Sequence, residues 1–267
     1  MSFAPQGRIA VVTGASSGIG EATARRLADV GMTVVAVARR AERLDALATE
    51  PRGGTGRIVA HVADVRSTDD VDALAARVRD EFGACHVLIN NAGVGGGAFN
   101  GRDDLDDALR TLDINLAGTV RCLAAFADLL EASAPARVIN VASVAGKIGI
   151  GPAGYAASKF GVVGLSEALH LSWASRGITV TQLNPGFIVT EGFPQTQLQG
   201  TPFGKVVGDP ADVAEAIVQV LRTGAWERTV PPWYRAFVTL RHVAPPLYRA
   251  IASRMDRSSG ERGYDTR

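Results

Sequence analysis

The sequence predicts an α/β fold in which helices cover both faces of one parallel sheet. Six short, largely apolar runs alternate with longer amphipathic stretches, which is the pattern of consecutive βαβ units. Runs with so few polar interruptions indicate strands that are buried on both faces. Glycines gather where the runs end, and in open α/β sheets ligands bind at that edge. A doubly wound sheet of the Rossmann type is therefore expected.

The elements follow in order along the chain. Strands are expected at 9–13, 33–38, 58–62, 87–90, 137–142 and 178–183. Helices are expected at 18–30, 41–49, 68–82, 105–130, 155–175 and 210–222. These elements make one domain over residues 1–230, because a chain of 267 residues with 46% hydrophobic content can bury one full core. Residues 231–267 form a C-terminal extension, in which Pro245 and Pro246 separate two short amphipathic helices.

Composition excludes several classes of function. The formal net charge is +1 and charged residues are spread along the chain, so no nucleic-acid partner is expected. The cysteines, Cys85 and Cys122, are too few for a disulfide framework or a metal site and are expected to be buried. No apolar run approaches the ~20 residues that span a bilayer, and residues 1–8 do not have the pattern of a signal peptide. A cytoplasmic protein is expected.

Three glycines, Gly14, Gly18 and Gly20, stand where the first predicted strand gives way to the first predicted helix. Glycine at such a turn lets the backbone approach a pyrophosphate closely. The N–H groups and the dipole of the helix start favour the same anion. The strand, turn and helix together predict a dinucleotide site.

Tyr155 and Lys159 are four residues apart in a predicted helix, so their side chains share one face. A free tyrosine titrates near ~10, and a neighbouring cation stabilises the phenolate. Lys159 is therefore expected to lower the pKa of the Tyr155 phenol and to make it a usable acid and base. Taken by itself, the pair could be two exposed residues on a helix. Together with the glycine turn near the N-terminus, it indicates an oxidoreductase.

Both motifs, with others between them, resemble the short-chain dehydrogenase/reductase family from about residue 8 to residue 230. The resemblance implies that Tyr155 protonates a carbonyl oxygen, Ser143 hydrogen-bonds that oxygen and Lys159 also holds the nicotinamide ribose. Ser143 precedes Tyr155 by one residue fewer than in many relatives, and Ala142 replaces the first serine of a frequent pair. Asn115 resembles the asparagine that holds a relay water, although it could instead be satisfied within the core. No metal is implied.

The resemblance also assigns the cofactor contacts. They fall in the glycine turn, after the predicted strands and in the catalytic helix, at Gly14, Ser16, Ser17, Gly18, Ile19, Gly20, Arg39, Arg40, Asp64, Val65, Asn91, Ala92, Gly93, Tyr155, Lys159, Pro185, Gly186, Ile188 and Thr190. Asp64 and Val65 are expected at the adenine, and the segment around Ile188 and Thr190 at the nicotinamide.

The end of the second predicted strand favours NADP(H) over NAD(H). Ala38 stands where an NAD preference would require an acidic residue for the ribose hydroxyls. Arg39 can grip a 2′-phosphate with its fork of donors, and Arg40 adds positive charge. The alternative is that both arginines are ordinary surface residues at a helix start.

The substrate is expected to be a ketone or secondary alcohol on an apolar small molecule. A lid at about residues 187–208 carries Phe193, Leu198 and Phe203, although such residues could also pack on the domain. Two alternatives stay open: a 3-oxoacyl-thioester reductase, and a non-catalytic regulator that senses NADP(H). The intact set of Asn115 with the serine, tyrosine and lysine described above argues against the regulator.

Partners are expected from the helices and the extension. The family resemblance implies a homodimer or homotetramer through the helices at 105–130 and 155–175. In the extension, residues 233–251 are expected to pack beside the lid and narrow the substrate pocket, with 258–267 loosely ordered. A second subunit and a membrane surface are the alternative sites for its apolar face, and the membrane ranks third.

Overall fold

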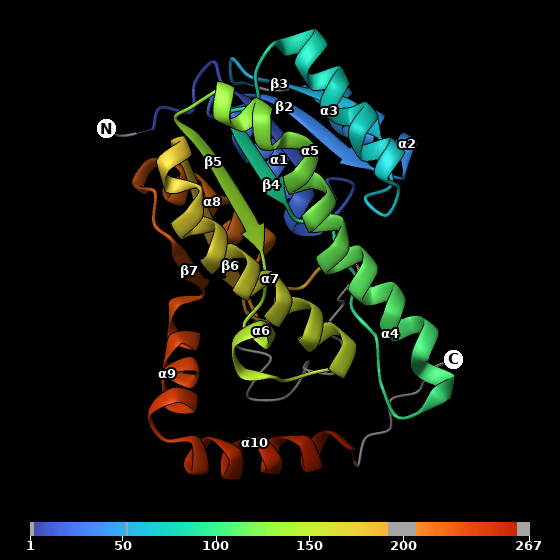
Figure 1. Cartoon of the computed structure of the whole chain (residues 1–267), viewed down its shortest axis with the longest axis vertical. Coiled ribbons are helices and arrows are strands. Elements are labelled where there is room, and N and C mark those ends of the chain that lie inside the picture. Colours follow the sequence, from blue (N-terminus) through green and yellow to red (C-terminus); the bar gives the residue numbers. More distant parts are fainter. Residues whose placement is uncertain (1–2, 52, 192–206, 261–267) are drawn as a thin grey trace.

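Seven strands form one parallel sheet in the order β3-β2-β1-β4-β5-β6-β7 (Figure 1). The structure is a computed structural model that describes residues 3–51, 53–191 and 207–260. The strands are β1 Ile9–Thr13, β2 Thr33–Ala38, β3 Arg57–Val62, β4 Val87–Asn90, β5 Ala136–Val141, β6 Ile178–Pro185 and β7 Glu227–Val230. The chain reverses its direction of winding between β1 and β4, so their carboxyl ends flank the crevice where such sheets bind ligands.

Helices fill the connections. They are α1 Gly18–Asp29, α2 Ala41–Thr49, α3 Thr68–Phe82, α4 Leu105–Leu112, α5 Gly118–Ala132, α6 Ala145–Ile148, α7 Ala153–Ser172, α8 Pro210–Thr223, α9 Arg235–Val243 and α10 Pro245–Gly260. Among the described residues, short 3-10 turns lie at Arg102–Asp104, Ala174–Arg176 and Pro232–Tyr234, and a π-helical turn at Asp113–Ala117 joins α4 to α5.

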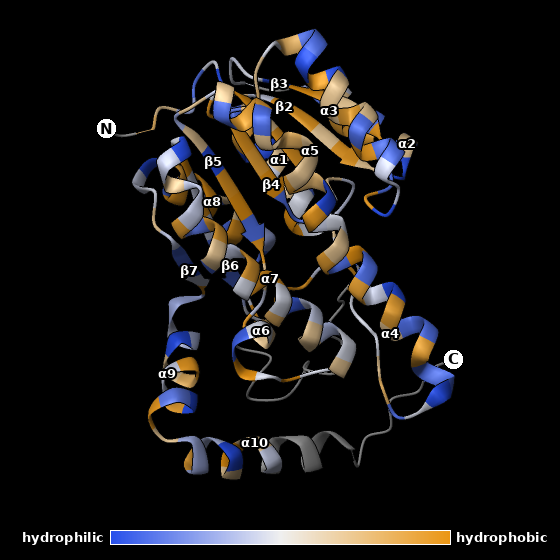
Figure 2. Ribbon diagram, viewed as in Figure 1, coloured by the Kyte–Doolittle hydropathy of each residue, from blue (hydrophilic) through white to orange (hydrophobic). Residues whose placement is uncertain are grey.

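The sheet lies between two helical layers, each with its own hydrophobic core. Helices α1, α2 and α8 pack on one face, and α3, α5 and α7 pack on the other. Hydrophobic residues concentrate on the strands between these layers (Figure 2). Strand β5 shows why the strands read as apolar runs, since all six of its residues are buried. The predicted doubly wound sheet is confirmed.

The structure adds β7 and the short helix α6 to the predicted elements, and it changes the bounds of several others. Strand β7 was not among the predicted strands, because its four residues include the polar Glu227, Arg228 and Thr229 and give a weak signal. The single helix predicted over 105–130 is interrupted by the π-helical turn Asp113–Ala117. A π turn keeps the chain helical, so the apolar pattern continues across it. The helix that carries Tyr155 runs over Ala153–Ser172 rather than 155–175.

Cys85 and Cys122 are buried free thiols, as predicted, and burial raises the pKa of each to about 12. Their thiolates are therefore scarce at neutral pH. In the described part of the chain, no helix is long and apolar enough to cross a membrane.

The described part of the extension packs against α6, beyond the carboxyl end of β5 (Figure 1). Tyr234 is buried, and its hydroxyl accepts a hydrogen bond from the Phe187 N–H at 3.2 Å. Tyr248 donates a hydrogen bond to the Ile148 carbonyl. Pro245 begins α10, which continues to Gly260, so the predicted break between two helices is present. The expected loose order of residues 258–267 stays a prediction, because residues 261–267 lie outside the described part of the chain. The predicted lid lies largely outside the described residues, including Phe193, Leu198 and Phe203.

Candidate active site

The glycine turn between β1 and α1 is shaped by its own close packing. Gly14 has a φ of 68°, a left-handed conformation that favours glycine. A Cβ atom on Gly20 would lie 2.2 Å from the Gly14 carbonyl oxygen, so only glycine fits there. The Thr13 hydroxyl accepts hydrogen bonds from the N–H groups of Asn91 and Ala92 at 3.0 and 3.1 Å. The turn is thereby held to the segment that follows β4.

The start of α1 has the donors that a pyrophosphate needs. Ser17 is its N-cap residue, but its side chain makes no capping hydrogen bond to the helix. The first N–H groups of the helix are therefore left for another acceptor, and the helix dipole favours an anion. With the positive φ of Gly14 and a basic cluster beside the turn, the residues present fit a dinucleotide phosphate.

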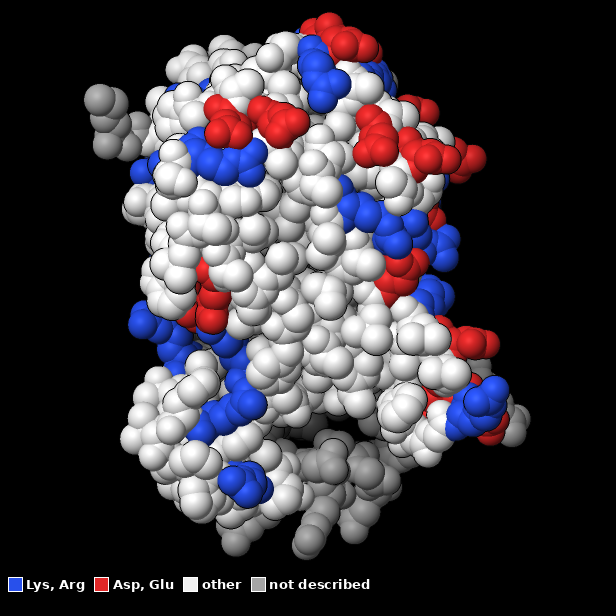
Figure 3. Space-filling model, viewed as in Figure 1, with Lys and Arg blue, Asp and Glu red and all other residues white. Residues whose placement is uncertain are grey.

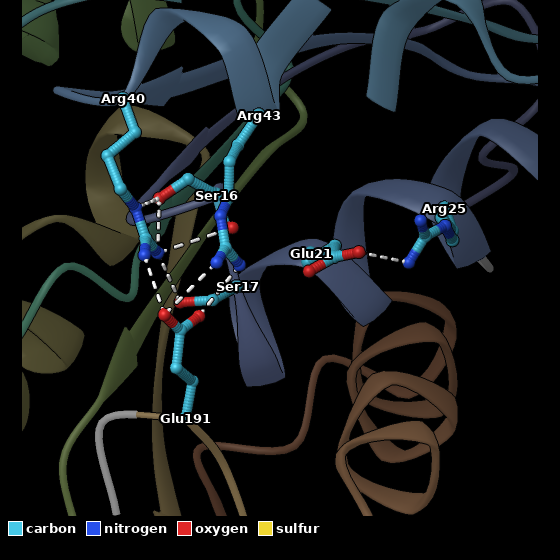
Figure 4. A network of polar contacts seen from close by, with 7 residues as sticks. All are labelled: Ser16, Ser17, Glu21, Arg25, Arg40, Arg43 and Glu191. Atoms are coloured by element: carbon cyan, nitrogen blue, oxygen red, sulfur yellow. Dashed lines mark hydrogen bonds and ion pairs between the residues drawn. The ribbon is translucent and has the colours of Figure 1, made fainter. Parts of the chain in front are cut away.

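That basic cluster is a network around Arg40 (Figure 4). The Arg40 guanidinium donates to the Ser16 hydroxyl at 3.0 and 3.1 Å and to the Ser17 hydroxyl at 2.8 Å. Through another nitrogen it donates to Glu191 at 3.0 Å. Arg43, one turn further along, donates to the same carboxylate at 2.7 Å. Two arginines and two hydroxyls thus converge on one point beside the glycine turn.

Arg39 and Asp64 lie beside each other, at the ends of β2 and β3. The Arg39 side chain is 59% exposed, and its nearest carboxylate contact is Asp64 at 4.0 Å. Asp64 accepts hydrogen bonds from the Arg66 guanidinium, the shortest at 2.6 Å, and this interaction holds the pKa of its carboxyl below the usual value. Val65 is buried against Gly118. The predicted adenine residues are therefore at the sheet edge, with the carboxylate already engaged.

Ser143, Tyr155 and Lys159 come together between β5 and α7. Ser143 follows the end of β5, and its hydroxyl accepts a hydrogen bond from the Ala145 N–H at 3.1 Å. The Tyr155 hydroxyl is hydrogen-bonded to Ser143. The Lys159 ammonium is 5.7 Å from the centroid of the Tyr155 ring and donates to the Val141 carbonyl at 2.9 Å. The predicted shared helix face is present, with Tyr155 still partly accessible.

The pKa of Tyr155 departs from the expectation. Burial raises the pKa of the phenol, and the hydrogen bond with Ser143 only partly opposes this effect. Burial also lowers the pKa of the Lys159 ammonium to about 8. The expected low pKa of the phenol is therefore not found in the cofactor-free protein, because burial disfavours the phenolate.

Asn115 lies in the π-helical turn with its amide group fully engaged. The amide donates to the Val94 carbonyl and to the Ser158 hydroxyl, both at 3.0 Å. Its oxygen accepts the Val94 N–H at 2.8 Å. A Cβ atom on Gly93 would lie 3.2 Å from that oxygen and 3.6 Å from the Lys159 ammonium. Asn115 therefore ties the segment after β4 to α7, which matches the second interpretation offered for it.

The end of β6 and the segment that follows it complete the site. The Pro185 carbonyl accepts a hydrogen bond from the Ser143 hydroxyl at 3.4 Å. Gly186 lies against the ring of Tyr234. Ile188 is buried, and Thr190 lies against the glycine turn, where a Cβ atom on Gly18 would be 2.8 Å from its methyl group. The segment thus runs from the chemical cluster to the glycine turn.

Sequence reasoning missed four residues of this region. Thr13 gave a usable signal, a polar residue at the end of an apolar strand directly before the glycine turn. Arg43 stands three residues after Arg40 in α2, a spacing that puts both on one helix face. Glu191 and Tyr234 gave no signal, because their contacts join segments far apart in the sequence.

Comparisons with known proteins agree with this geometry. A family model described as short chain dehydrogenase matches residues 8–199. The 3-oxoacyl-(acyl-carrier-protein) reductase of Synechocystis sp. is 38% identical over 216 residues, which cover 79% of this chain and 87% of the relative. The D-threitol dehydrogenase of Mycolicibacterium smegmatis is 40% identical over 191 residues, covering 71% and 73%.

Two solved structures share the fold. A short-chain dehydrogenase/reductase from Burkholderia phymatum in complex with NAD has a TM-score of 0.79 and 28% identity, covering 92% of this chain and 96% of its own. A variant of actinorhodin polyketide ketoreductase with NADPH has a TM-score of 0.73 and 31% identity, covering 86% and 97%. One neighbour holds NAD and the other holds NADPH, so both forms of the cofactor occur among similar proteins.

Proposed function

The chain belongs to the short-chain dehydrogenase/reductase family, and we propose that it is an NADP(H)-dependent oxidoreductase for a ketone or secondary alcohol on an apolar small molecule. The observation that carries the proposal is the cluster of Ser143, Tyr155 and Lys159 at the carboxyl end of β5. It combines a hydroxyl donor, a protonated phenol and a buried cation, next to a helix start with free N–H groups.

Each residue of the cluster has a distinct task in this proposal. Tyr155 gives its proton to the carbonyl oxygen during reduction, and the raised pKa keeps the phenol protonated at neutral pH. The Ser143 hydroxyl donates a hydrogen bond to the same oxygen and offsets its developing charge. Lys159 holds positive charge beside the phenol. When bound, the nicotinamide supplies or accepts the hydride.

The preference for NADP(H) is proposed from the arginines after β2. The Arg39 side chain is 59% exposed, and within the described part of the chain its ion pair is a 4.0 Å contact with Asp64, so its guanidinium is available to a 2′-phosphate. Ala38 at the end of the strand offers no carboxylate to the ribose hydroxyls of NAD(H).

Arg39→Ala is expected to lower the preference for NADPH over NADH about tenfold to hundredfold. One charge-assisted phosphate contact contributes roughly 1.5–3 kcal/mol, and NADH lacks that phosphate. The ratio of kcat/KM for the two cofactors measures the effect. Arg110→Ala, an exposed arginine on α4 paired with Asp107, is the control and should leave the ratio unchanged. Equal kcat/KM for NADPH and NADH in the unmodified protein would overturn the assignment.

An apolar cluster directly after Ser143 supports an apolar substrate. Val144, Ile148 and Tyr234 are its buried members, and Phe187, Phe237 and other partly buried side chains pack against them. A 3-oxoacyl thioester is the second candidate, because relatives such as the Synechocystis protein are named as reductases of that class. A ketone or thioester bound against this apolar cluster would place its carbonyl oxygen near the hydroxyls of Ser143 and Tyr155.

The proposal is tested by following NADPH oxidation with a panel of apolar ketones and with acetoacetyl-CoA. Reduction of an apolar ketone supports the first substrate class, and preferred reduction of the thioester supports the second. Tight NADPH binding with no turnover on any compound would contradict enzymatic function and favour an NADP(H)-sensing regulator.

The extension is proposed to form one side of the substrate region. Its partly buried side chains Phe237, Val238 and Tyr248 belong to the apolar cluster after Ser143. Residues 231–253 contain no Asp or Glu. The charged side chains over α9 are therefore basic, as seen at the lower left of Figure 3.

A chain that ends after Ala244 is expected to show a KM for apolar ketones about three- to tenfold higher, with NADPH affinity within about twofold. This cut removes α10 and Tyr248 but keeps the buried Tyr234, which a cut after Val230 would remove. Loss of about 1 kcal/mol of apolar contact corresponds to such a change. An unchanged KM in the folded, shortened protein would assign α10 to assembly or membrane contact instead.

Exposed apolar side chains support the proposed homodimer or homotetramer. Leu109 on α4, Val120 on α5 and Leu171 on α7 are 53%, 45% and 79% exposed. These helices include the regions proposed as the subunit interface, where a second copy would cover such side chains.

A further inference from the structure

The Glu191 carboxylate lies in the basic cluster that a 2′-phosphate would use. Its two oxygens accept from Arg40 at 3.0 Å and from Arg43 at 2.7 Å. Arg40 also holds the hydroxyls of Ser16 and Ser17 in the glycine turn. A carboxylate therefore occupies an anion position that is fixed from the β2 end, from the turn and from α2 (Figure 4).

We propose that Glu191 is a specificity-determining residue that competes with the 2′-phosphate of NADP(H) for Arg40 and Arg43, and that Arg43 is a further ligand of that phosphate. The inference rests on the proposed NADP(H) dependence. It adds that Glu191 weakens the binding of NADP(H). Glu191 would lower the affinity for NADP(H) selectively, because NAD(H) has no phosphate that must displace the carboxylate.

The chemistry of the two anions supports this competition. Carboxylates and phosphates bind the guanidinium fork in similar geometries, so one set of donors serves both. The 2′-phosphate carries more charge than a carboxylate and can also accept from the Ser17 hydroxyl, which lies beside Arg40 and the Glu191 carboxylate (Figure 4). Binding of NADP(H) therefore exchanges a weaker anion for a stronger one at the same two arginines.

Exposure explains why the effect should appear in ligand binding rather than in folding. The side chains of Arg40, Arg43 and Glu191 are 43%, 50% and 49% exposed. Ion pairs at that exposure contribute little to the stability of a fold. Their removal should leave the protein folded while it frees both arginines for a ligand.

Glu191→Gln is expected to bind NADPH and adenosine 2′,5′-bisphosphate about three- to tenfold more tightly, the range that two exposed ion pairs supply. Its affinity for NADH should stay within about twofold. Calorimetric titration of the full chain gives the three dissociation constants. Glu50→Gln is the matched control, because it also removes one carboxylate from an exposed arginine pair, that of Arg25 on the neighbouring helix.

Arg43→Ala tests the second part of the proposal. We expect it to weaken NADPH binding about tenfold, and we expect Glu191→Gln to gain less affinity on this background, because one contested partner is gone. An identical gain on both backgrounds would show that Arg43 is not shared by the carboxylate and the phosphate.

The outcomes separate this inference from the proposed function. If the unmodified protein binds NADH better than NADPH, the proposed NADP(H) dependence is wrong. The proposed competition between Glu191 and the 2′-phosphate is then wrong as well. If NADPH is preferred but Glu191→Gln leaves its affinity unchanged or weaker, only the role of Glu191 is wrong. Equal tightening of NADPH and NADH, or the same gain in Glu50→Gln, would reveal a general charge effect and also overturn the inference.

Discussion

Tyr155→Phe is expected to lower kcat by about a hundredfold to ten-thousandfold, the contribution of a positioned general acid. The substitution removes only the hydroxyl that is hydrogen-bonded to Ser143 and leaves the ring beside the Lys159 ammonium. The dissociation constant for NADPH should therefore stay within about twofold. Steady-state rates with the best substrate of the panel, together with NADPH titration, measure both quantities.

Tyr248→Phe is the matched control for this change. It removes the hydroxyl that donates to the Ile148 carbonyl, outside the chemical cluster. Its kcat is expected to stay within about threefold of the unmodified value. Near-normal turnover by Tyr155→Phe would contradict the assigned proton donor.

Lys159→Met is expected to abolish most turnover while it stabilises the cofactor-free protein by about 2 kcal/mol at pH 7. The pKa of Lys159 falls from 10.5 to about 8 on burial, which costs roughly 3 kcal/mol at ~1.36 kcal/mol per unit. The variant also loses the hydrogen bond to the Val141 carbonyl, which offsets about 1 kcal/mol of the gain. Urea unfolding of both proteins measures the difference.

The stability difference should depend on pH in a defined direction. Below pH about 8 the lysine is charged in both the folded and unfolded states, so its desolvation penalty is fully present. Between pH about 8 and 10.5 the folded protein releases this proton first, and the unmodified protein gains stability relative to the variant. The advantage of Lys159→Met should therefore shrink across this window.

Lys147→Met provides the comparison for that experiment. Lys147 is also little exposed, but it pairs with Glu167 and Glu227 at 3.4 Å. Removing it takes the paired cation away from both carboxylates, although Glu227 keeps a hydrogen bond from the Asn184 amide, so no gain in stability is expected. A Lys159→Met protein that is no more stable at pH 7, or whose advantage grows with pH, would show that the buried ammonium is not penalised.

Much of the fold was predictable because the signals were local. The runs that became β1, β2 and β4 were largely apolar, and their bounds agree with the structure. Glycines and caps fixed several helix ends; Ser67, for example, accepts the Asp70 N–H at the start of α3. The π-helical turn had no such signal, since it changes the hydrogen-bonding pattern without ending the helix.

The site was predictable as a set of residues but not as an electrostatic environment. Ser143 and Tyr155 were identified from motifs, whereas the pKa of the phenol depends on how deeply the folded chain buries it. The contact of Glu191 with Arg40 joins residues 151 positions apart, and no local pattern indicates it. Contacts between residues so far apart in the chain depend on tertiary packing, which cannot be predicted from the local pattern of a single sequence.

Transfer of deuterium is the most direct test of the central claim, that this chain moves a hydride between NADP(H) and a carbonyl carbon with Tyr155 as the proton donor. The protein is incubated with the substrate panel and with NADPH that carries deuterium at the transferable position of the nicotinamide ring. Mass spectrometry of the product should find one deuterium on the carbinol carbon with the unmodified protein, and little labelled product with Tyr155→Phe. NADPH binding without labelled alcohol from any ketone or from acetoacetyl-CoA, or equal labelling by Tyr155→Phe, would contradict the claim.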